Sequence, residues 1–460
     1  MSTQARSSER HLSAIEAGPP LWEDERFYFA LCALNALVIT GFWWHTLGAL
    51  PIHRPADAIN AIGRLTGLLG TYMVLWQLVL MARLPWIERA FGMERVIVVH
   101  RLNAYLSLGL ILVHGVLQTI GYMLVDGLSF MGQLGDFVSG YQGMLAAIVG
   151  LLLMILVAGL SVAVARRRLS YQTWYFIHLY AYLAVAIAFS HEILLGADFI
   201  NSPLFVAYWV VLYVLVAGAL LGFRVGLPVY RLGHHGLRVE RVVREAHGAV
   251  SIYIQGRHLE DLNYAGGQFM LWRFLDRQRW WEAHPYSLSL PPNRTHLRLT
   301  VRGLGDFSAA LAGIRPGTPV MVEGPFGHFT AERCQSLKAL LVAGGIGITP
   351  IRCLAEELAG RGVDVRVVYS CRRERDFALR DELEGLESSL GVEVDFLVDE
   401  KRQRRQTDWF RAGNLRRLVP DVAERELYLC GPDGLTRELL RSADQLRIPG
   451  SRIHTEAFRF

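Results

Sequence analysis

Four histidines lie in two pairs inside apolar segments of membrane-span length. His100 and His114 are fourteen residues apart, and His178 and His191 are thirteen residues apart. Ionisable side chains at bilayer depth are costly, so matched pairs indicate a site. At about 1.5 Å per residue each separation covers roughly 20 Å, which places one histidine of each pair near either face of a ~30 Å hydrocarbon core. This spacing predicts two stacked b-type haems, each held by two imidazoles.

The thirteen-residue step does not fit a straight helix. At 100° per residue, fourteen residues return to within about 40° of the first face, whereas thirteen end about 140° away. The segment with His178 and His191 must therefore bend, unwind or roll around the haems. Ordinary histidines in polar pockets are the alternative, and two matched pairs make it the weaker one.

Arg64 is a lone charge in an apolar segment that reads Gly63-Arg64-Leu65-Thr66-Gly67. Such a charge needs a partner, and a haem propionate would supply one. Snorkelling of the side chain to the outer surface is an equal alternative, so Arg64 is a candidate haem contact only.

The first half of the chain has the composition of a membrane domain. The mean hydropathy is +0.26, and 52% of the 460 residues are hydrophobic. Six apolar stretches have the length of a span, and no cleavage site follows the first, so a signal peptide is not indicated. They lie at 27–49, 62–82, 98–124, 142–165, 175–197 and 203–226. After residue 228 the pattern changes to short alternating runs.

Basic residues predict the orientation. Arg83, Arg89, Arg95 and the run 166–168 lie at one side of the spans, whereas the loops 125–140 and 192–202 carry acids and no lysine or arginine. The positive-inside rule then places both termini in the cytoplasm of a multi-pass cell-membrane protein, with His100 and His178 on the cytoplasmic side. These loops also explain the net charge of +5, so nucleic-acid binding is not indicated. The five cysteines show no metal-ligand spacing.

Two motifs in the second half suit a flavin. Gly266-Gly267-Gln268-Phe269 and His284-Pro285-Tyr286-Ser287 are typical of a small antiparallel barrel. Tyr286 could stack on an isoalloxazine while Ser287 bonds its N5 edge. The strand 297–302, with Thr300 and Arg302, runs into the turn Gly303-Leu304-Gly305-Asp306-Phe307-Ser308. Backbone N–H groups of that turn, with Arg302, could hold a pyrophosphate.

A third motif predicts a dinucleotide site. The buried-strand run 338–343 is followed at once by Gly344-Gly345-Ile346-Gly347-Ile348-Thr349-Pro350, which opens a helix. Glycines at such a junction let the backbone approach a pyrophosphate. Strands near 364–369, 392–397 and 426–430 alternate with helices, as a doubly wound parallel sheet requires. The last ends in Cys430-Gly431-Pro432, where Cys430 is either a nicotinamide contact, the preferred reading, or a buried structural thiol.

Together these motifs resemble the NADPH oxidase and ferric reductase superfamily, close in layout to its single-chain prokaryotic NADPH oxidases. The resemblance covers residues 25 to 460 and rests on the paired histidines, HPYS, the GxGxxS-like turn, GGIGITP and CGP in that order. It implies that NAD(P)H reduces FAD, and that electrons pass to the inner haem at His100 and His178 and then to the outer haem at His114 and His191. The acceptor outside is usually dioxygen or a chelated metal.

The resemblance also implies a role for Phe460, because a terminal aromatic in this superfamily often stacks on the flavin until nicotinamide displaces it. Two positions depart from the pattern: Gly266 replaces the usual proline, and Tyr286-Ser287 replaces Phe-Thr. No EF-hand loop is present in the sequence, so calcium control is not expected. Ser370 and Arg372 follow a predicted strand without an acidic neighbour, which favours NADPH over NADH.

The predicted fold is a six-helix haem-binding bundle followed by a ferredoxin-reductase-like module. Its expected parts are a cytoplasmic tail (1–24), the transmembrane domain (25–228), an FAD-binding barrel (229–335) and an NAD(P)H-binding α/β domain (336–460). The expected activity is NADPH oxidation with superoxide production outside the membrane. The alternatives are a ferric or other metal-chelate reductase, or a membrane carrier that feeds a partner protein. The short outer loops favour a small acceptor and no obligatory protein partner.

Overall fold

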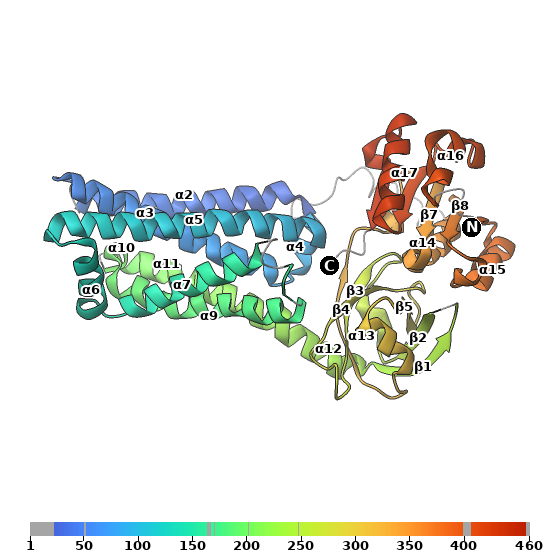
Figure 1. Cartoon of the computed structure of the whole chain (residues 1–460), viewed down its shortest axis with the longest axis horizontal. Helices are drawn as coiled ribbons and strands as arrows, with labels where there is room; N and C mark the ends of the chain where they lie inside the picture. Colours follow the sequence, from blue (N-terminus) through green and yellow to red (C-terminus); the bar gives the residue numbers. More distant parts are fainter. Residues whose placement is uncertain are drawn as a thin grey trace, which may run out of the picture. The chain divides into compact units, whose positions relative to one another are not determined.

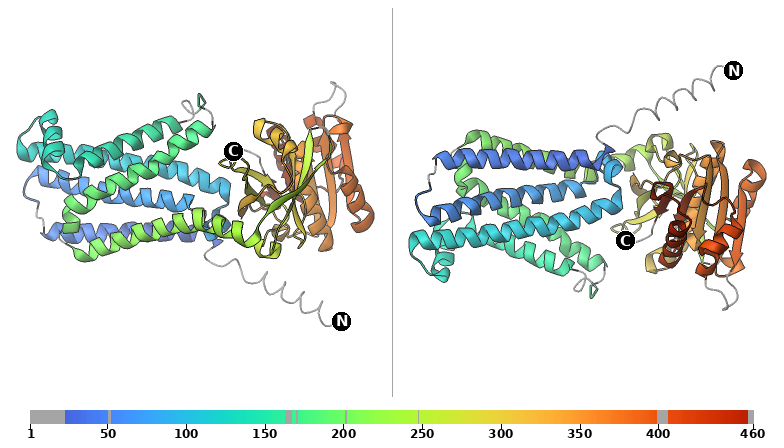
Figure 2. Two further views of the ribbon diagram at one scale, coloured as in Figure 1. Left: turned by 90° about the horizontal axis from the view of Figure 1, so that it is seen from below. Right: turned by 90° about the horizontal axis from the view of Figure 1, so that it is seen from above.

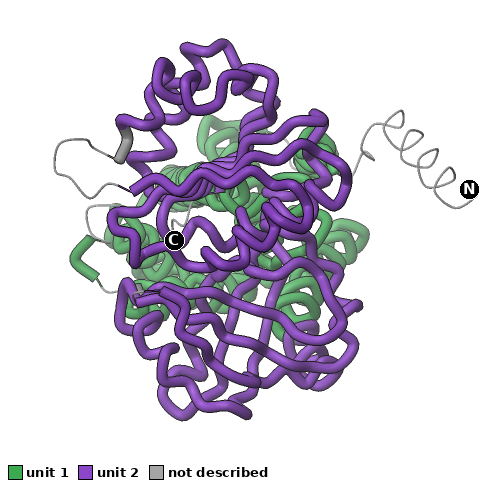
Figure 3. Tube along the Cα trace, turned by 90° about the vertical axis from the view of Figure 1, so that its right-hand side faces the viewer, with its two compact units in different colours: residues 1–225 green, residues 226–460 purple. Residues whose placement is uncertain are grey.

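The computed structural model describes residues 23–49, 52–162, 167–169, 171–200, 202–246, 248–398 and 406–456. The chain divides into two compact units, residues 1–225 and 226–460 (Figure 3). Each unit is described by itself. The predicted N-terminal tail, apart from residues 23 and 24, lies outside the described residues, as do Arg166 and Phe460.

In the described part of unit 1, all regular secondary structure is helical (Figure 1). Its long helices are joined by short ones, α4, α6 and α10, and a π-helical stretch follows α11. The bounds are α2 (Glu25–Ala49), α3 (Pro55–Met81), α4 (Pro85–Phe91), α5 (Met93–Asp126), α6 (Phe130–Gly140), α7 (Met144–Ser161), α9 (Tyr171–Leu195), α10 (Ala197–Ile200), α11 (Pro203–Ala219) and the π segment (Leu220–Gly226).

Six helices in the described residues are long and apolar enough to cross a membrane. They are Glu25–Leu47, Pro55–Met81, Met93–Asp126, Met144–Ser161, Gln172–Leu195 and Pro203–His235. Each contains or overlaps one of the six apolar stretches found in the sequence, so the prediction of six spans is confirmed. Helix Met93–Asp126 extends beyond its apolar stretch at both ends, where polar residues can reach the interface, whereas Met144–Ser161 is shorter than its stretch.

Glycines set the distance between the helices that carry the histidines and the helices behind them. A Cβ atom at Gly67 of α3 would lie 2.5 Å from Nδ1 of His114 in α5, and one at Gly70 would lie 2.8 Å from Cγ1 of Ile111. In the second pair of helices, a Cβ at Gly150 of α7 would lie 2.9 Å from the carbonyl oxygen of Ala184 in α9. Small residues let membrane helices approach closely. Figure 2 shows α3 and α5 side by side in both views.

Unit 2 begins with α12 (Leu227–His235) and two three-stranded antiparallel sheets. Their strand orders are β1-β2-β5 and β4-β3-β6. The bounds are β1 (Arg238–Arg244), β2 (Ala249–Gln255), β3 (Phe269–Phe274), β4 (His284–Ser287), β5 (His296–Arg302) and β6 (Val320–Phe326). Bridges from Leu288 to Leu299 and from Arg238 to Pro319 join the sheets around one apolar core, which makes the predicted small barrel.

The remaining strands form one parallel sheet in the order β11-β10-β7-β8-β9. The strands are β7 (Lys338–Gly344), β8 (Asp364–Cys371), β9 (Glu393–Val398), β10 (Glu426–Cys430) and β11 (Ile453–Glu456). Helices α14 (Ile348–Gly360) and α15 (Arg380–Leu390) pack on one face, and α16 (Ala412–Leu418) and α17 (Asp433–Gln445) on the other. The doubly wound sheet predicted from the alternating pattern is therefore present.

A buried charge cluster, called here the interdomain clamp, connects the barrel to this sheet domain. Arg298 of β5 is 1% exposed, and its Nη2 donates to Oε2 of Glu382 in α15 at 2.9 Å while its Nη1 donates to Oε1. Arg352 of α14 approaches the same carboxylate at 2.8 Å. Burial opposes ionisation, but the two guanidinium groups hold the pKa of Glu382 below its ordinary value. The clamp stays charged at neutral pH.

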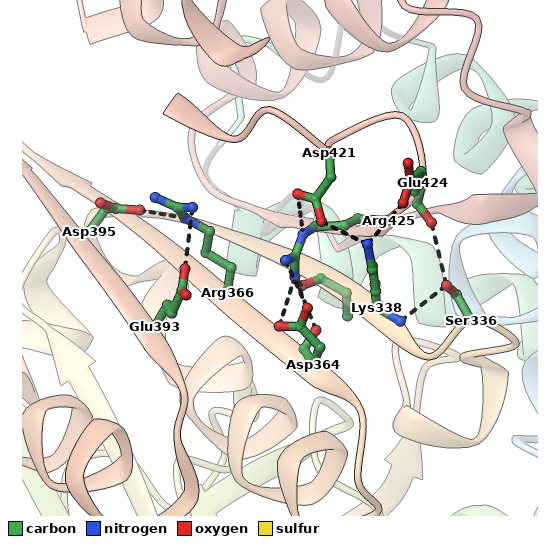
Figure 4. Close-up of polar contacts among 10 residues, drawn as sticks. Ser336, Lys338, Asp364, Arg366, Glu393, Asp395, Asp421, Glu424 and Arg425 are labelled. Atoms are coloured by element: carbon green, nitrogen blue, oxygen red, sulfur yellow. Dashed lines mark hydrogen bonds and ion pairs between the residues drawn. The ribbon is translucent and has the colours of Figure 1, made fainter. Parts of the chain in front are cut away.

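A second charge network lies at the amino edge of the parallel sheet (Figure 4). Arg425 contacts Asp364 at 2.9 Å and Asp421 at 2.8 Å, and Lys338 contacts Asp421 at 3.1 Å. Arg425 also donates to the carbonyl oxygens of Ala339 and Asp364, so it ties the starts of β7 and β8 together. This edge is opposite the carboxyl ends where such sheets bind ligands.

We expect Arg425→Met to destabilise unit 2 and to flatten its acid dependence. Arg425, with Lys338, lowers the pKa of Asp421 to about 2. The unfolded value is about 3.9, so the stabilisation is complete above pH ~4 and is lost as pH falls toward ~2. Loss of hydrogen bonds to a charged group should cost about 1.5–3 kcal/mol at neutral pH. Thermal release of FAD fluorescence at several pH values measures this.

Arg366→Met is the matched control, because Arg366 pairs at the same edge with Glu393, which is 63% exposed, and with Asp395. Exposed pairs contribute about 0–1 kcal/mol. Equal effects of the two substitutions would contradict the role given to Arg425.

Candidate functional site

The two histidine pairs face each other between α5 and α9. The ring centroids of His100 and His178 are 6.1 Å apart, and those of His114 and His191 are 6.5 Å apart. A metal–imidazole bond is about 2.0–2.1 Å, so two imidazoles on opposite sides of one iron have centroids about 6 Å apart. The described parts of α5 and α9 also make few close backbone contacts with each other. The residues therefore fit a haem at each of two levels.

Nδ1 of three of the four rings has an oxygen partner. His114 Nδ1 lies 2.8 Å from the carbonyl oxygen of Gly63, His178 Nδ1 lies 3.2 Å from Oγ of Ser161, and His191 Nδ1 contacts the carbonyl oxygen of Ala188. Partners at Nδ1 fix the tautomer and direct Nε2 toward a metal. His100 Nδ1 is buried without a hydrogen-bond partner among the described residues.

The thirteen-residue step is accommodated without unwinding. Helix α9 is continuous from Tyr171 to Leu195, and both of its histidines still meet their partners on α5. Of the three expectations, bending and rolling remain. The contact of His191 with Ala188, one turn earlier, shows that its ring is turned back along the helix.

Arg64 has a protein counter-charge that the sequence did not reveal. Its Nε donates to Oδ2 of Asp198 in α10 at 3.0 Å, and the Asp198 side chain is 3% exposed. Nη2 of Arg64 is buried and has no hydrogen-bond partner among the described residues. The ion pair with the buried Asp198 disfavours snorkelling, and the contact of Nη2 with a haem propionate stays a prediction.

Glu192 is a second buried charge-bearing group that sequence reasoning missed. It follows His191, and its carboxyl oxygens accept hydrogen bonds from Oγ1 of Thr71 and from the hydroxyl of Tyr213, both at 3.0 Å. Its partners belong to α3 and α11, so the contact joins three spans beside the outer histidine pair. From the sequence, residue 192 is counted among the acids of a loop, whereas the structure places it in the last turns of α9.

The flavin candidates lie on β4. Ser287 is 3% exposed, and its Oγ has no hydrogen-bond partner among the described residues. A buried hydroxyl without a partner fits the expected bond to the flavin N5 edge. Tyr286 is half-buried, and burial raises the pKa of its hydroxyl, so the group stays protonated. The ring of His284, the residue before Pro285, stacks on the ring of Phe307, with the ring centroids 3.8 Å apart.

The turn predicted to hold a pyrophosphate is partly closed on itself. Backbone N–H groups of Leu304 and Gly305 donate to Oγ of Ser308, both at 3.0 Å. Asp306 follows them, exposed at the start of a short helix. The hydroxyl of Thr300 is hydrogen-bonded inside the barrel to the hydroxyls of Ser251 and Ser289.

Arg302 stands between the two nucleotide motifs. Its Nη2 lies 3.8 Å from Asp376, and a Cβ atom at Gly345 would lie 3.9 Å from its Nη1. A groove of about 480 Å³ beside the 303–308 turn is lined in part by Arg244, Gly248, Gly303 and Ser308. Arg244 is a second cation at this place that the sequence analysis did not select.

We expect Arg302→Ala to raise the dissociation constant of FAD. Loss of a charge-assisted contact costs about 1.5–3 kcal/mol, which corresponds to roughly ten- to a hundredfold. Fluorescence titration of flavin-depleted protein measures this, with the exposed Arg294→Ala as the matched control. If the Michaelis constant of NADPH rises while the affinity for FAD is unaltered, Arg302 binds NADPH instead of FAD.

The glycines after β7 have different surroundings. A Cβ atom at Gly347 would lie 2.2 Å from the carbonyl oxygen of Cys430, and one at Gly344 would lie 2.7 Å from Cδ of Pro432. Both are therefore required by close packing of the β7 and β10 strand ends. Gly345, at φ +56°, faces open space near Arg302. Thr349 and Pro350 are buried in the first turn of α14.

This junction is the topological switch point of the sheet. From β7 the chain goes to β8 and β9 on one side and then to β10 and β11 on the other. Ligands bind at the carboxyl ends of strands at such a point. Cys430 and Gly431 lie there, and burial, followed by the nearby Glu456, raises the pKa of the Cys430 thiol well above its ordinary value. Glu456 is paired in register with Cys430 and was not selected from the sequence.

Gly266, which replaces the usual proline, has a local explanation. Its N–H donates to Oε1 of Glu357 in α14 at 2.7 Å. Proline has no N–H, so this second contact between the barrel and the sheet domain needs another residue. Ser370 is buried at the end of β8, and Arg372 is exposed just after it, so the predicted 2′-phosphate contacts stay a prediction.

Comparison with known families identifies both halves. The description "Ferric reductase like transmembrane component" matches residues 66–189, which contain His100, His114 and His178 and end two residues before His191. The description "Oxidoreductase NAD-binding domain" matches residues 341–439, from β7 into α17.

The chain is also similar to individual reductases and to an electron transfer subunit. Ferredoxin–NADP reductase B of Sorangium cellulosum is 30% identical over 194 residues, 38% of this chain and 77% of that protein. The probable dihydroorotate dehydrogenase B electron transfer subunit of Methanothermobacter thermautotrophicus is 26% identical over 46% of this chain and 74% of its own length. The chain spans only 52% of the stachydrine N-demethylase reductase subunit of Rhizobium meliloti, at 29% identity.

Among solved structures, a ferredoxin NADP+ reductase from Neisseria gonorrhoeae with bound FAD and NADP is 16% identical, with a TM-score of 0.42, over 48% of this chain and 98% of that one. The match to the NAD-binding domain supports NAD(P)H as a substrate of this chain. With a ferric-reductase-like membrane domain preceding a ferredoxin-reductase-type module, the chain belongs to the NADPH oxidase and ferric reductase superfamily.

Proposed function

We propose that this protein oxidises cytoplasmic NADPH and delivers the electrons across the membrane to dioxygen, which yields superoxide. The observation that carries the proposal is the pair of ring separations, 6.1 Å and 6.5 Å, at two levels between α5 and α9. Each suits two imidazoles on one haem iron. The superfamily membership and the nucleotide motifs at the switch point support the same route.

The residues have separate tasks in this route. Bound FAD would accept a hydride and release electrons one at a time, and two haems would carry single electrons. Ser287 and Tyr286 orient the flavin ring, and Cys430 lies where the nicotinamide is expected. His100 and His178 hold the inner haem, and His114 and His191 hold the outer one. Partners at Nδ1 keep the ligating rings of His114, His178 and His191 in one tautomer.

The orientation proposed from the sequence is supported by the helix ends. His100 lies near the start of α5, which follows Arg89 of α4 and contains Arg95. His114 lies deeper in α5, toward the end that carries Asp126. Arginine-rich segments stay in the cytoplasm. The histidine pair at the arginine-rich end is therefore the inner one.

A small acceptor is supported by the short connections at the predicted outer face. Between α9 and α11 the described residues form one single-turn helix, Ala197–Ile200, whose Asp198 is bound to Arg64. Reduction of a ferric chelate is the second candidate, and the matched family description favours it specifically.

Parallel assays on the purified full chain distinguish these acceptors. Superoxide production predicts NADPH-dependent oxygen consumption and cytochrome c reduction that superoxide dismutase abolishes. Ferric reduction predicts ferrozine-trapped Fe(II) at the same rate without oxygen. Cytochrome c reduction that is insensitive to the dismutase would contradict superoxide as the product.

A further inference from the structure

We propose that His234, His258 and Asp261 form a binding site for a divalent transition-metal ion on the barrel. One ligand atom from each residue lies within 4.8 Å of the others. These three residues, called here the barrel cluster, are separate from the haem, flavin and nucleotide candidates. Imidazole nitrogens suit zinc, iron, nickel and copper, and two histidines with one carboxylate leave coordination positions for water.

The distances in the barrel cluster are close to those of a metal site. Nε2 of His234 lies 2.9 Å from Oδ2 of Asp261. Neighbouring ligand atoms on an ion with bonds of about 2.0–2.1 Å stand about 3 Å apart. The ring of His258 is stacked on that of His234, with centroids 4.8 Å apart and planes 17° apart. The two imidazoles are therefore neighbours, and one ligand atom of each lies within 4.8 Å of a carboxylate oxygen of Asp261.

The chain holds the ligands in place from two segments. His234 is in the last turn of α12. The ring of Tyr230, one turn earlier, also stacks on the His234 ring, with the centroids 5.2 Å apart. His258 and Asp261 belong to the turn around the 3-10 helix Leu259–Leu262, and His258 has φ +50°. Left-handed backbone at a non-glycine residue costs about 1–2 kcal/mol and is often retained at functional sites.

The charges around the barrel cluster allow a cation to bind. The carboxylate of Asp261, whose side chain is 55% exposed, would supply negative charge to the ion. The nearby guanidinium of Arg257 donates to the carbonyl oxygen of Gly233 at 3.1 Å. His235 is turned away, with Nδ1 3.2 Å from the carbonyl oxygen of Arg257.

A bound ion would join the end of α12 to the turn at 258–262. Helix α12 continues the last apolar helix, and its Arg231 donates to the carbonyl oxygen of Gly324 in β6. The ion would add a further attachment of α12 to the barrel, beside the contacts of Gly233 and His235 with Arg257, and it would stabilise the folded unit because the unfolded chain does not present the ligands together.

Zinc binding by the full-length, tag-free protein, with its haems and FAD, tests the site. The protein is dialysed to equilibrium against buffered micromolar zinc, and zinc per chain is measured by mass spectrometry. Asp261→Asn and His258→Gln keep side-chain size and remove one ligand each. His296→Gln is the matched control, since that histidine lies in the same unit and bonds to Thr295 instead.

We expect the unaltered protein and His296→Gln to bind one more zinc ion than either ligand variant. Affinity should fall by more than about a hundredfold, since loss of even an outer-shell partner costs ten- to a hundredfold. Zinc should also raise the temperature of FAD release in the unaltered protein and leave it unchanged in Asp261→Asn. Equal zinc content in all four proteins, with haem and FAD retained, overturns the proposal.

Discussion

Alanine in place of His100 or His178 is expected to leave the purified protein with one haem instead of two, and to stop electron delivery to the outer acceptor. Each substitution would remove one of the two imidazoles proposed to hold the inner haem, whose ring centroids are 6.1 Å apart. The loss of haem affinity should exceed a hundredfold, because removing only an outer-shell partner of a ligand costs about ten- to a hundredfold. A pyridine haemochrome titration measures the haem content.

The second histidine pair and the flavin provide the comparisons. His114→Ala or His191→Ala should remove the outer haem and leave the inner one. In all four variants NADPH should still reduce ferricyanide, which takes electrons from flavin directly. The exposed His45, in the first span, is the control, and His45→Ala should keep both haems. A single haem in the unaltered protein would refute the two-level arrangement.

Valine at position 345 is expected to abolish NADPH oxidation while haem and FAD stay bound. The new side chain would enter the space beside the glycine motif after β7, where the NADPH pyrophosphate is expected. Loss of charge-assisted phosphate contacts should weaken NADPH binding by at least ten- to a hundredfold, from about 1.5–3 kcal/mol per contact. Steady-state kinetics with NADPH, alongside haem and flavin absorbance, measure the effect.

Two further glycines separate binding from folding. Gly391, at φ +70° with open space around it, has a comparable backbone, so Gly391→Val reports the conformational cost alone. Gly347→Val should instead reduce the amount of folded protein, because its side chain meets the Cys430 carbonyl. If Gly345→Val and Gly391→Val have the same kinetics, the pyrophosphate does not lie at Gly345.

Local sequence patterns were sufficient to predict much of this structure. The six spans follow from apolar length, and the parallel sheet follows from alternating strands and helices, because both depend on residues that are near in sequence. The histidine pairs could be found because two matched pairs of ionisable residues lie inside apolar segments. Whether these residues bind haem stays a prediction.

What the sequence could not provide were partners that are distant in the chain. Arg64 and Asp198 are 134 residues apart, and Glu192 meets Thr71 across 121 residues. No local pattern encodes such pairs, because helix packing decides them. The packing role of Gly347 was missed for the same reason, since the Cys430 carbonyl comes from a strand on the other side of the switch point.

The interdomain clamp affects how this reductase can be recombined with those of its relatives. A chimera that replaced the nucleotide domain with one lacking an acid at the position of Glu382 would leave Arg298, 1% exposed, without its carboxylate. Stranding one member of a buried ion pair costs about 3–5 kcal/mol. Such a chimera needs a compensating change at position 298. The flavin and nucleotide domains therefore have to be exchanged as one piece. The same constraint makes them evolve together.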